Sequence, residues 1–208
     1  MEALVSPEDL TEDDAQRRVR ILLALASCMA VKGYRATTIS DIARAARVSK
    51  TVVYAHFRDK EECLHELYSR ATDRVLQMVL EAQARTHREG LAWRDRLRVV
   101  ITTYLEALAA GPAVAWAALV EIQAAGREAL SRRRTVVDRY VDLLVDVTAE
   151  LVAEHPDEVR PVSRQLLVAA VGGINELMLS RVERGGAAEL TEDADVASVV
   201  LIGLLERR

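Results

Sequence analysis

The chain has 208 residues, of which 50% are hydrophobic and 4% aromatic, and its formal net charge is −4. Two cysteines are too few for a disulfide framework, and neither a signal-peptide pattern nor an apolar run of membrane-spanning length is seen, so we expect a soluble cytoplasmic protein. The abundance of Ala, Leu, Val, Arg and Glu favours helices over sheets.

Positive charge is concentrated near the N-terminus. The segment 15–60 contains ten Lys and Arg residues but only two acids, Asp41 and Asp59, so it carries +8 while the rest of the chain carries −12. A basic segment on an acidic protein is typical of proteins that bind a polyanion. A merely solvated charged face is the alternative interpretation of the charge taken alone.

The sequence begins with a tail and a first helix. Residues 1–14 are acidic and lack a clear apolar stripe, so we expect them to be disordered. From Ala15 onward, apolar residues recur every three or four positions, which predicts a helix. Gly33 is the expected end of that helix.

Two short helices are predicted next. Thr38 is the expected N-cap of a helix over residues 39–46, with Asp41 returning a bond to the Thr38 amide as in a capping box. After a short break, Ser49 is the expected N-cap of a second helix over residues 50–56.

The remaining sequence predicts further helices, and we find no convincing strand and no repeat. Glycine and proline residues punctuate these helices. They are expected from Asp59 to about His87, beyond Gly90 as far as Gly111-Pro112, over a short apolar segment 114–122, in a long stretch that stops before Pro156, from about 159 to 184, and from 191 to about 206.

Residues 37–60 carry the main functional signal. The helix over 50–56 is too short to be stable alone, and Val53 and Phe57 form an apolar side that other helices can hold. Its polar side is then free to reach a groove. This arrangement is that of a helix-turn-helix, whose second helix enters the major groove of DNA.

The same stretch resembles the DNA-binding domain of the TetR family of regulators, over roughly residues 15–75. The matching features are Gly33-Tyr34, Thr37-Thr38, Asp41-Ile42-Ala43, Val48-Ser49-Lys50, Tyr54, His56-Phe57 and Lys60-Glu61. One departure is Arg47, where the family often has glycine, and a positive φ at this residue would cost some backbone strain. The rest of the chain resembles the family only in the layout of its helices.

The resemblance implies that polar residues in and around the helix-turn-helix, about residues 38–57, contact DNA. Base edges would be read by Lys50 and Thr51, and Thr38 would contact phosphate. Core packing is the alternative for Tyr54, and helix capping is the alternative for His56. The full set of expected DNA-contacting residues is Thr38, Ser40, Ser49, Lys50, Thr51, Tyr54, His56 and Lys60.

The resemblance also implies a homodimer that binds a palindromic double-stranded operator, with the last two long helices of each subunit forming a four-helix bundle. Gly172 and Gly173 permit close approach of helices. The last helix has an apolar face made of Val196, Val199, Val200, Gly203 and Leu204. Packing within one subunit is the alternative for these residues.

An effector pocket is implied between the middle helices. Asn175 interrupts an apolar stripe and needs partners if it is buried. The aliphatic surroundings suggest a lipophilic effector that weakens operator binding, with the helix from Asp59 to about His87 as the lever between the domains. The candidate pocket residues are Trp93, Tyr104, Trp116, Glu121, Gln123, Asn175 and Met178.

Two other classes of function account for part of the sequence pattern. Glu62-x-x-His65 resembles half of a di-iron motif, but no second copy accompanies it and no phosphate loop or nucleophile constellation is seen, so we expect no catalytic residue, metal or cofactor. A protein-interaction module with a basic face would explain the charge but not the pattern at Lys50 and Tyr54. A ligand-independent regulator and an activator both stay open.

Together these features predict an all-α protein of about nine helices. We expect a tail over 1–14, a three-helix helix-turn-helix domain over 15–75, and a helical effector-binding and dimerisation domain over 76–208. The predicted function is a DNA-binding transcriptional regulator, most simply a repressor that a small effector releases. Its expected partners are an operator, an unidentified effector and a second copy, with no membrane.

Overall fold

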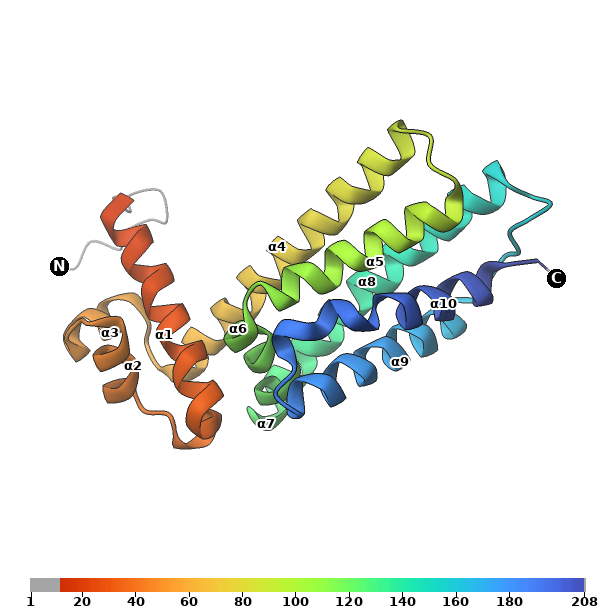
Figure 1. Ribbon diagram of the computed structural model, residues 1–208. Helices are drawn as coiled ribbons and strands as arrows, with labels where there is room; N and C mark the ends of the chain where they lie inside the picture. The colour runs from red at the N-terminus through yellow and green to blue at the C-terminus, as the bar shows by residue number, and fades with distance from the viewer. Residues whose placement is uncertain (1–11, 208) are drawn as a thin grey trace.

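A computed structural model describes residues 12–207 as helices joined by short connections (Figure 1). When α6, η2 and α7 are taken as one segment, these residues form nine α-helical segments. Within 12–207 the only extended pairing is an isolated bridge between Val159 and Glu206. The predicted all-α fold class is therefore confirmed.

The N-terminal part consists of α1 (Glu12–Ala36), α2 (Ile39–Ala46) and α3 (Lys50–His56). These helices pack around the start of α4 (Lys60–Arg88) and share one core with it. Because α3 is too short to be stable alone, it depends on the apolar side that it contributes to this core. The fully buried core members include Ile21, Leu25, Met29, Ile42, Val53, Phe57 and Leu64.

The predicted capping residues fix the ends of α2 and α3. Thr38 Oγ1 accepts the Asp41 amide at 3.3 Å, and Asp41 Oδ2 accepts the Thr38 amide at 2.9 Å, which completes the predicted capping box. Ser49 Oγ accepts the Val52 amide at 3.2 Å and caps α3. Arg47, between the two helices, has a left-handed φ of 56°, which costs some backbone strain for a residue other than glycine.

Helix α4 leaves the N-terminal part and continues into the body of the molecule (Figure 1). The body consists of α5 (Trp93–Ala109), α6 (Pro112–Trp116), α7 (Ile122–Ala124), α8 (Arg127–Glu154), α9 (Arg164–Glu183) and α10 (Ala194–Leu205). A π-helical turn, η2 (Ala117–Glu121), joins α6 to α7, and a 3₁₀ turn, η3 (Ala187–Asp193), precedes α10.

The N-terminal part rests on the body through the second half of α1, which packs against α6 and η2. Regular helical geometry in α1 is interrupted at Gly33, whose φ of 77° and ψ of 163° lie in a region that is essentially restricted to glycine. The predicted end of the first helix at Gly33 therefore coincides with this interruption.

Two helix starts differ from the prediction. The helix expected from about Val159 begins at Arg164, because the preceding residues run beside the C-terminal end of α10, where the Arg160 amide donates to the Leu205 carbonyl at 2.8 Å. The apolar Val159 is buried there instead of on a helix face. The helix expected from Thr191 begins at Ala194, since the residues before it form η3.

The predicted tail over 1–14 lies outside the described residues except for its last three, which form the first turn of α1. No single helix within 12–207 is both long and apolar enough to cross a membrane. In the described part of the chain, α5 and the α6–α7 segment together have the length and composition of a span, but the pair is bent by 100°.

Candidate functional site

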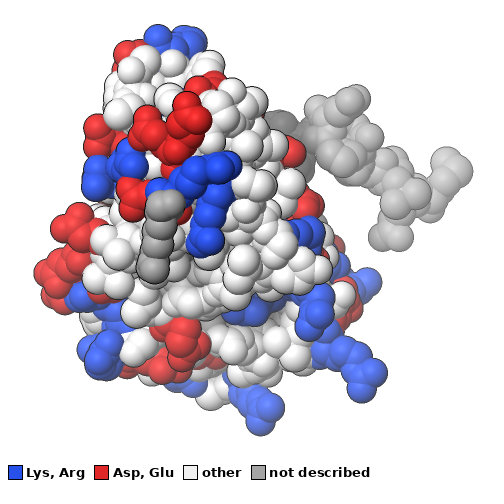
Figure 2. All heavy atoms as spheres, turned by 90° about the vertical axis from the view of Figure 1, so that its right-hand side faces the viewer, with Lys and Arg blue, Asp and Glu red and all other residues white. Residues whose placement is uncertain are grey.

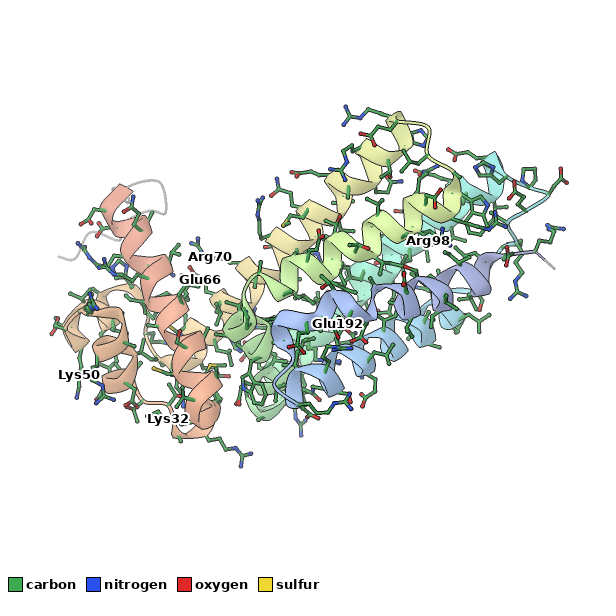
Figure 3. The ribbon with its side chains drawn as sticks, viewed as in Figure 1. Lys32, Lys50, Glu66, Arg70, Arg98 and Glu192 are labelled. Carbon is green, nitrogen blue, oxygen red and sulfur yellow. The ribbon has the colours of Figure 1, made fainter. Side chains whose placement is uncertain are left out.

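The polar face of α2 and α3 lies at the end of the molecule away from the body, where Lys50 projects from α3 (Figure 3). Ser40, Lys50 and Thr51 are exposed, and Tyr54 is 56% exposed although it is a large aromatic residue. Phe57 is buried in the core, as predicted from the spacing. This face presents hydroxyl, ammonium and phenol groups to a partner.

The hydroxyls of Thr38 and Ser49 are already used in capping, although both residues are exposed. Thr38 Oγ1 also donates to Asp41 Oδ2 at 2.5 Å, and Lys32 pairs with the same carboxylate. The ammonium of Lys32 and the bonds from Thr38 hold the pKa of Asp41 well below its usual range. Asp41 therefore stays ionised and fixes the start of α2.

His56 and Lys60 are more engaged than their neighbours. The His56 ring is half-buried, and burial lowers its pKa, which favours the neutral ring. Lys60 Nζ donates to the carbonyls of Tyr34 at 2.6 Å and Thr37 at 2.8 Å, and it lies 4.1 Å from the centre of the Tyr34 ring. Lys60 thus links the start of α4 to the backbone at the end of α1 and before α2. Its role in phosphate binding stays a prediction.

Several basic side chains of the N-terminal part keep an uncompensated charge. Others are paired: Arg18 with Glu66, Lys32 with Asp41. Within residues 15–60, by contrast, four exposed cations have neither an ion pair nor a hydrogen bond from their side chains: Arg20, Arg35, Arg47 and Lys50. Their free charges are available to a polyanion.

A cavity of about 470 Å³ lies in the body, mainly between α4, α5 and α8. Its lining is largely apolar, with aliphatic and aromatic side chains that include Met78, Val100, Ile101, Val137, Leu144 and Val147. This volume and this lining are typical of a small-molecule binding site.

Three tyrosines give the cavity polar groups near its end toward the N-terminal part. Burial raises the pKa of Tyr68 to about 12 and raises the pKa values of Tyr104 and Tyr140 as well. The rings of Tyr104 and Tyr140 meet edge to face, with centroids 5.4 Å apart. All three phenols are therefore neutral hydrogen-bonding groups at neutral pH.

Two of the seven predicted pocket residues, Tyr104 and Asn175, line this cavity. Trp93 lies in a separate core at the far end of the body, where its Nε1 donates to Glu158 at 3.1 Å. Met178 is buried in the core that α9 shares with α5 and α10. Gln123 is exposed and donates to the Leu119 carbonyl at 2.7 Å. Trp93, Met178 and Gln123 therefore all lie outside the lining.

The remaining two predicted pocket residues, Trp116 and Glu121, form a link between the body and α1. Glu121 is buried; its Oε1 accepts Trp116 Nε1 at 2.9 Å and its Oε2 accepts the Tyr34 amide at 2.7 Å. A Cβ added at Gly33 would lie 3.5 Å from Glu121 Oε1. The carboxylate thus accepts a hydrogen bond from the backbone where α1 is interrupted, and it does not face the cavity.

Three basic residues of the cavity lining were not predicted from the sequence: Arg74, Arg96 and Arg133. A charged residue in a helical pattern is ordinarily assigned to the solvent face. The signal for Arg133 was its spacing, since it precedes Val137 and Tyr140 on the same stripe of α8.

One group of side chains has the composition of a metal site. Ligand atoms of Glu61, His65 and Glu128 lie within 4.8 Å of one another. Glu128 is occupied by Arg132, which donates to it at 2.9 Å, and both glutamates are exposed. Glu62, the other half of the motif noted in the sequence, accepts the Arg58 amide at 2.6 Å, so it is engaged with the backbone just before α4.

Sequence comparison finds that part of this chain is similar to bacterial regulatory proteins. A family model described as bacterial regulatory proteins, tetR family, matches residues 21–67. The HTH-type transcriptional repressor KstR2 of Rhodococcus jostii (strain RHA1) is 35% identical over 102 residues, which are 49% of this chain and 48% of that protein. The chain thus matches about half the length of this curated relative.

Comparison with solved structures extends the similarity to most of the chain. The fatty acid degradation regulator FadR from Bacillus halodurans has a TM-score of 0.77 and 21% identity, covering 92% of this chain and 97% of that one. FadR from Bacillus subtilis in complex with stearoyl-CoA has a TM-score of 0.71 and 19% identity, covering 88% and 97%. At these identities the likeness concerns the fold.

Proposed function

Because residues 21–67 match the family model of tetR-family bacterial regulatory proteins, we propose that the chain belongs to that family and is a sequence-specific DNA-binding transcriptional regulator. The observation that carries this proposal is the exposed polar face of α3, where Lys50, Thr51 and Tyr54 project from a helix whose other side is held in the core. Exposed cations of the N-terminal part, including Arg35 and Arg47, are unpaired, which favours a polyanion partner.

In this proposal α3 enters the major groove and α2 lies across the DNA backbone. Lys50 and Thr51 read base edges, because they lie in the first turn of α3. Tyr54, Ser40 and the unpaired arginines contact phosphates. The hydroxyls of Thr38 and Ser49 stabilise the helix ends that present these groups.

The regulator acts as a homodimer through α9 and α10. Both helices expose large apolar residues, including Leu166 and Leu177 on α9 and Val196, Val199 and Val200 on α10. A single recognition helix offers few contacts, and a two-fold dimer places two of them on paired half-sites. The same symmetry predicts a palindromic operator.

The effector is proposed to be a molecule with a long apolar portion that occupies the cavity between α4, α5 and α8. The cavity's apolar lining supports this class of ligand. The structurally similar FadR from Bacillus subtilis is in complex with stearoyl-CoA, which has a long acyl chain. We propose that binding of the effector releases the protein from DNA, so that it acts as a repressor.

Two connections support coupling between the cavity and the DNA-binding face. Helix α4 lines the cavity from Tyr68 to Gln83 and packs in the core of the N-terminal part at its start, which fits the proposed lever. The η2 turn supplies Ala118 and Leu119 to the lining and Glu121 to the α1 amide. A ligand whose binding moves either segment has different affinities for the DNA-free and the DNA-bound states, and this difference weakens DNA binding.

Selection from a random duplex DNA library with the purified full chain tests the proposal. Enrichment of a palindromic sequence is the expected result. Absence of any enriched sequence, at low as well as at high salt, would contradict it and would favour an interaction module with a basic face.

A further inference from the structure

The cavity has a charged residue at each of its two ends. Its lining runs along α4 from Tyr68 to Gln83, a span of about 22 Å at 1.5 Å per residue. On α8 the lining begins with Arg133. Glu154, which binds Arg96, lies about six turns further along the same helix, so the two ends of the cavity are about 30 Å apart.

Arg133 is at the end toward the N-terminal part. It is half-buried and lies near enough to Tyr68 and Tyr104 to lower the pKa values of both phenols against the effect of burial. Among residues 12–207 its guanidinium has no acid and no hydrogen-bond partner. A half-buried cation without a counter-charge is an unfavourable arrangement that an anion would relieve.

Arg96 is at the opposite end and differs from Arg133 in its electrostatics. It is 5% exposed, and its Nη1 donates to Glu154 Oε2 at 2.7 Å, so its charge is already compensated. Its Nη2 is buried and has no hydrogen-bond partner in the described part of the chain. Buried donors are almost always paired, so this one calls for an acceptor.

The charges around Arg96 decide which acceptor fits. Glu154 also faces His87, at 3.4 Å between Oε1 and Nδ1, and Glu150 accepts a bond from Gln83 nearby. A second carboxylate would be placed beside Glu154 and repelled by it. A neutral oxygen, such as a hydroxyl or a carbonyl, accepts the Nη2 proton without that repulsion.

We propose that the cavity recognises an elongated apolar molecule that has an anionic head group at the Arg133 end and a neutral oxygen acceptor at the Arg96 end. This inference rests on the proposed function only in taking the cavity as the effector site. It narrows the effector from acyl compounds in general to those that are oxygenated at the end remote from the head group, such as hydroxylated or keto-substituted chains and rings.

The test compares ligands that differ at one end. The purified full chain is titrated by calorimetry, without DNA, with hexadecanoic acid, ω-hydroxyhexadecanoic acid, hexadecanedioic acid and hexadecanol. We expect the hydroxy acid to bind about 10-fold more tightly than hexadecanoic acid, because it satisfies a charged donor. The diacid should bind more weakly than the hydroxy acid, and hexadecanol more weakly than either monoacid.

Variants with adjacent controls assign each end. R96L should abolish the preference for the hydroxy acid, whereas R98L, an exposed arginine on the same helix that pairs with Asp95, should keep it (Figure 3). R96L together with E154L removes the ion pair as a unit and should also abolish the preference. R133L should weaken both monoacids about 10-fold, whereas R132L, which lies outside the cavity lining, should not.

The proposal is overturned if the hydroxy acid and hexadecanoic acid bind equally, if the diacid binds most tightly, if R96L retains the preference, or if none of the four compounds binds. These outcomes are independent of DNA. A protein that shows the ligand preference but selects no duplex would contradict the proposed function and leave this inference standing.

Discussion

At the scale of single residues, the proposed DNA interface depends on side chains that contribute little to the core. Tyr54 shows this best, because it is exposed while its neighbour Phe57 is buried. An exposed phenol on a short helix has no stabilising role of its own, so its loss should affect binding and leave folding unchanged.

We therefore predict that Y54F weakens operator binding about 10-fold, since one hydrogen bond to a charged phosphate is lost. The melting temperature should not change. Y34F is the matched control, because Tyr34 contacts Lys60 through its ring and not through a hydroxyl bond. Operator binding by fluorescence anisotropy measures both variants, and equal affinities of Y54F and wild type would contradict the assignment.

Asp41 provides a prediction for pH. Lys32 and Thr38 lower its pKa from the ordinary value of 3.8, so its contribution to stability is fully present above pH 3.8 and is lost as the pH falls toward the lower folded-state value. The stability difference between wild type and D41N should therefore be largest near pH 7 and should shrink below pH 3.8.

Urea unfolding at a series of pH values measures this difference. D146N, at an exposed aspartate of α8, should match wild type throughout. A D41N deficit that grows as the solution is acidified would show that the sign is wrong.

At the scale of the elements, local signals and tertiary placement differ in how well they can be predicted. Thr38, Ser49 and Asp59 cap the helices that the sequence indicated, because a cap is made by residues three positions apart. Predicting the pocket residues required knowing which buried helix face borders the cavity and which packs against a neighbouring helix. Periodicity does not distinguish these cases, so Trp93 and Met178 were assigned to a lining that they do not join.

The cavity arginines were missed for a related reason. Arg96 can be buried only because Glu154, 58 positions later in the chain, compensates its charge. Likewise, Glu121 was expected to face a ligand, whereas its partner is the Tyr34 amide, 87 positions away. Such pairings arise from the packing of α5 against α8 and of α1 against η2, and they leave no local pattern in the sequence.

The link through Glu121 leads to a prediction for the η2 turn. Both of its partners are N–H donors, so E121Q places an amide against one of them and should lower the free energy of unfolding by about 1–3 kcal/mol. It should also reduce the factor by which an effector weakens operator binding. E106Q, at an exposed position of α5, is the control and should change neither quantity.

Urea unfolding and operator titrations with and without effector measure these two effects. If E121Q retains the full effector response, the signal passes through α4 and not through η2.

At the scale of the whole molecule, charge and apolar surface are distributed unevenly. Figure 2 views the end of the body opposite the DNA-binding face, where acidic and basic side chains are intermixed. The basic excess belongs to the N-terminal segment. The exposed valines of α10 lie on the body, so the proposed surfaces for dimerisation and for DNA binding are separate.

We predict that V199D converts the dimer into a monomer, because Val199 is 70% exposed on α10 and a buried charge would oppose association. V31D, at a valine that is 86% exposed on α1, is the matched control and should remain dimeric. Light scattering coupled to size-exclusion chromatography measures the mass. A V199D variant that stays dimeric would place the interface elsewhere.

The most direct test of the central claim is the salt dependence of operator affinity for wild type and K50A. The account predicts that wild-type affinity falls steeply and linearly in a double-logarithmic plot against salt, and that K50A, which removes an exposed unpaired cation of α3, binds the selected duplex about 10-fold or more weakly. An affinity that is independent of salt, or a K50A variant that binds the selected duplex as tightly as wild type, would contradict the claim that this face reads DNA.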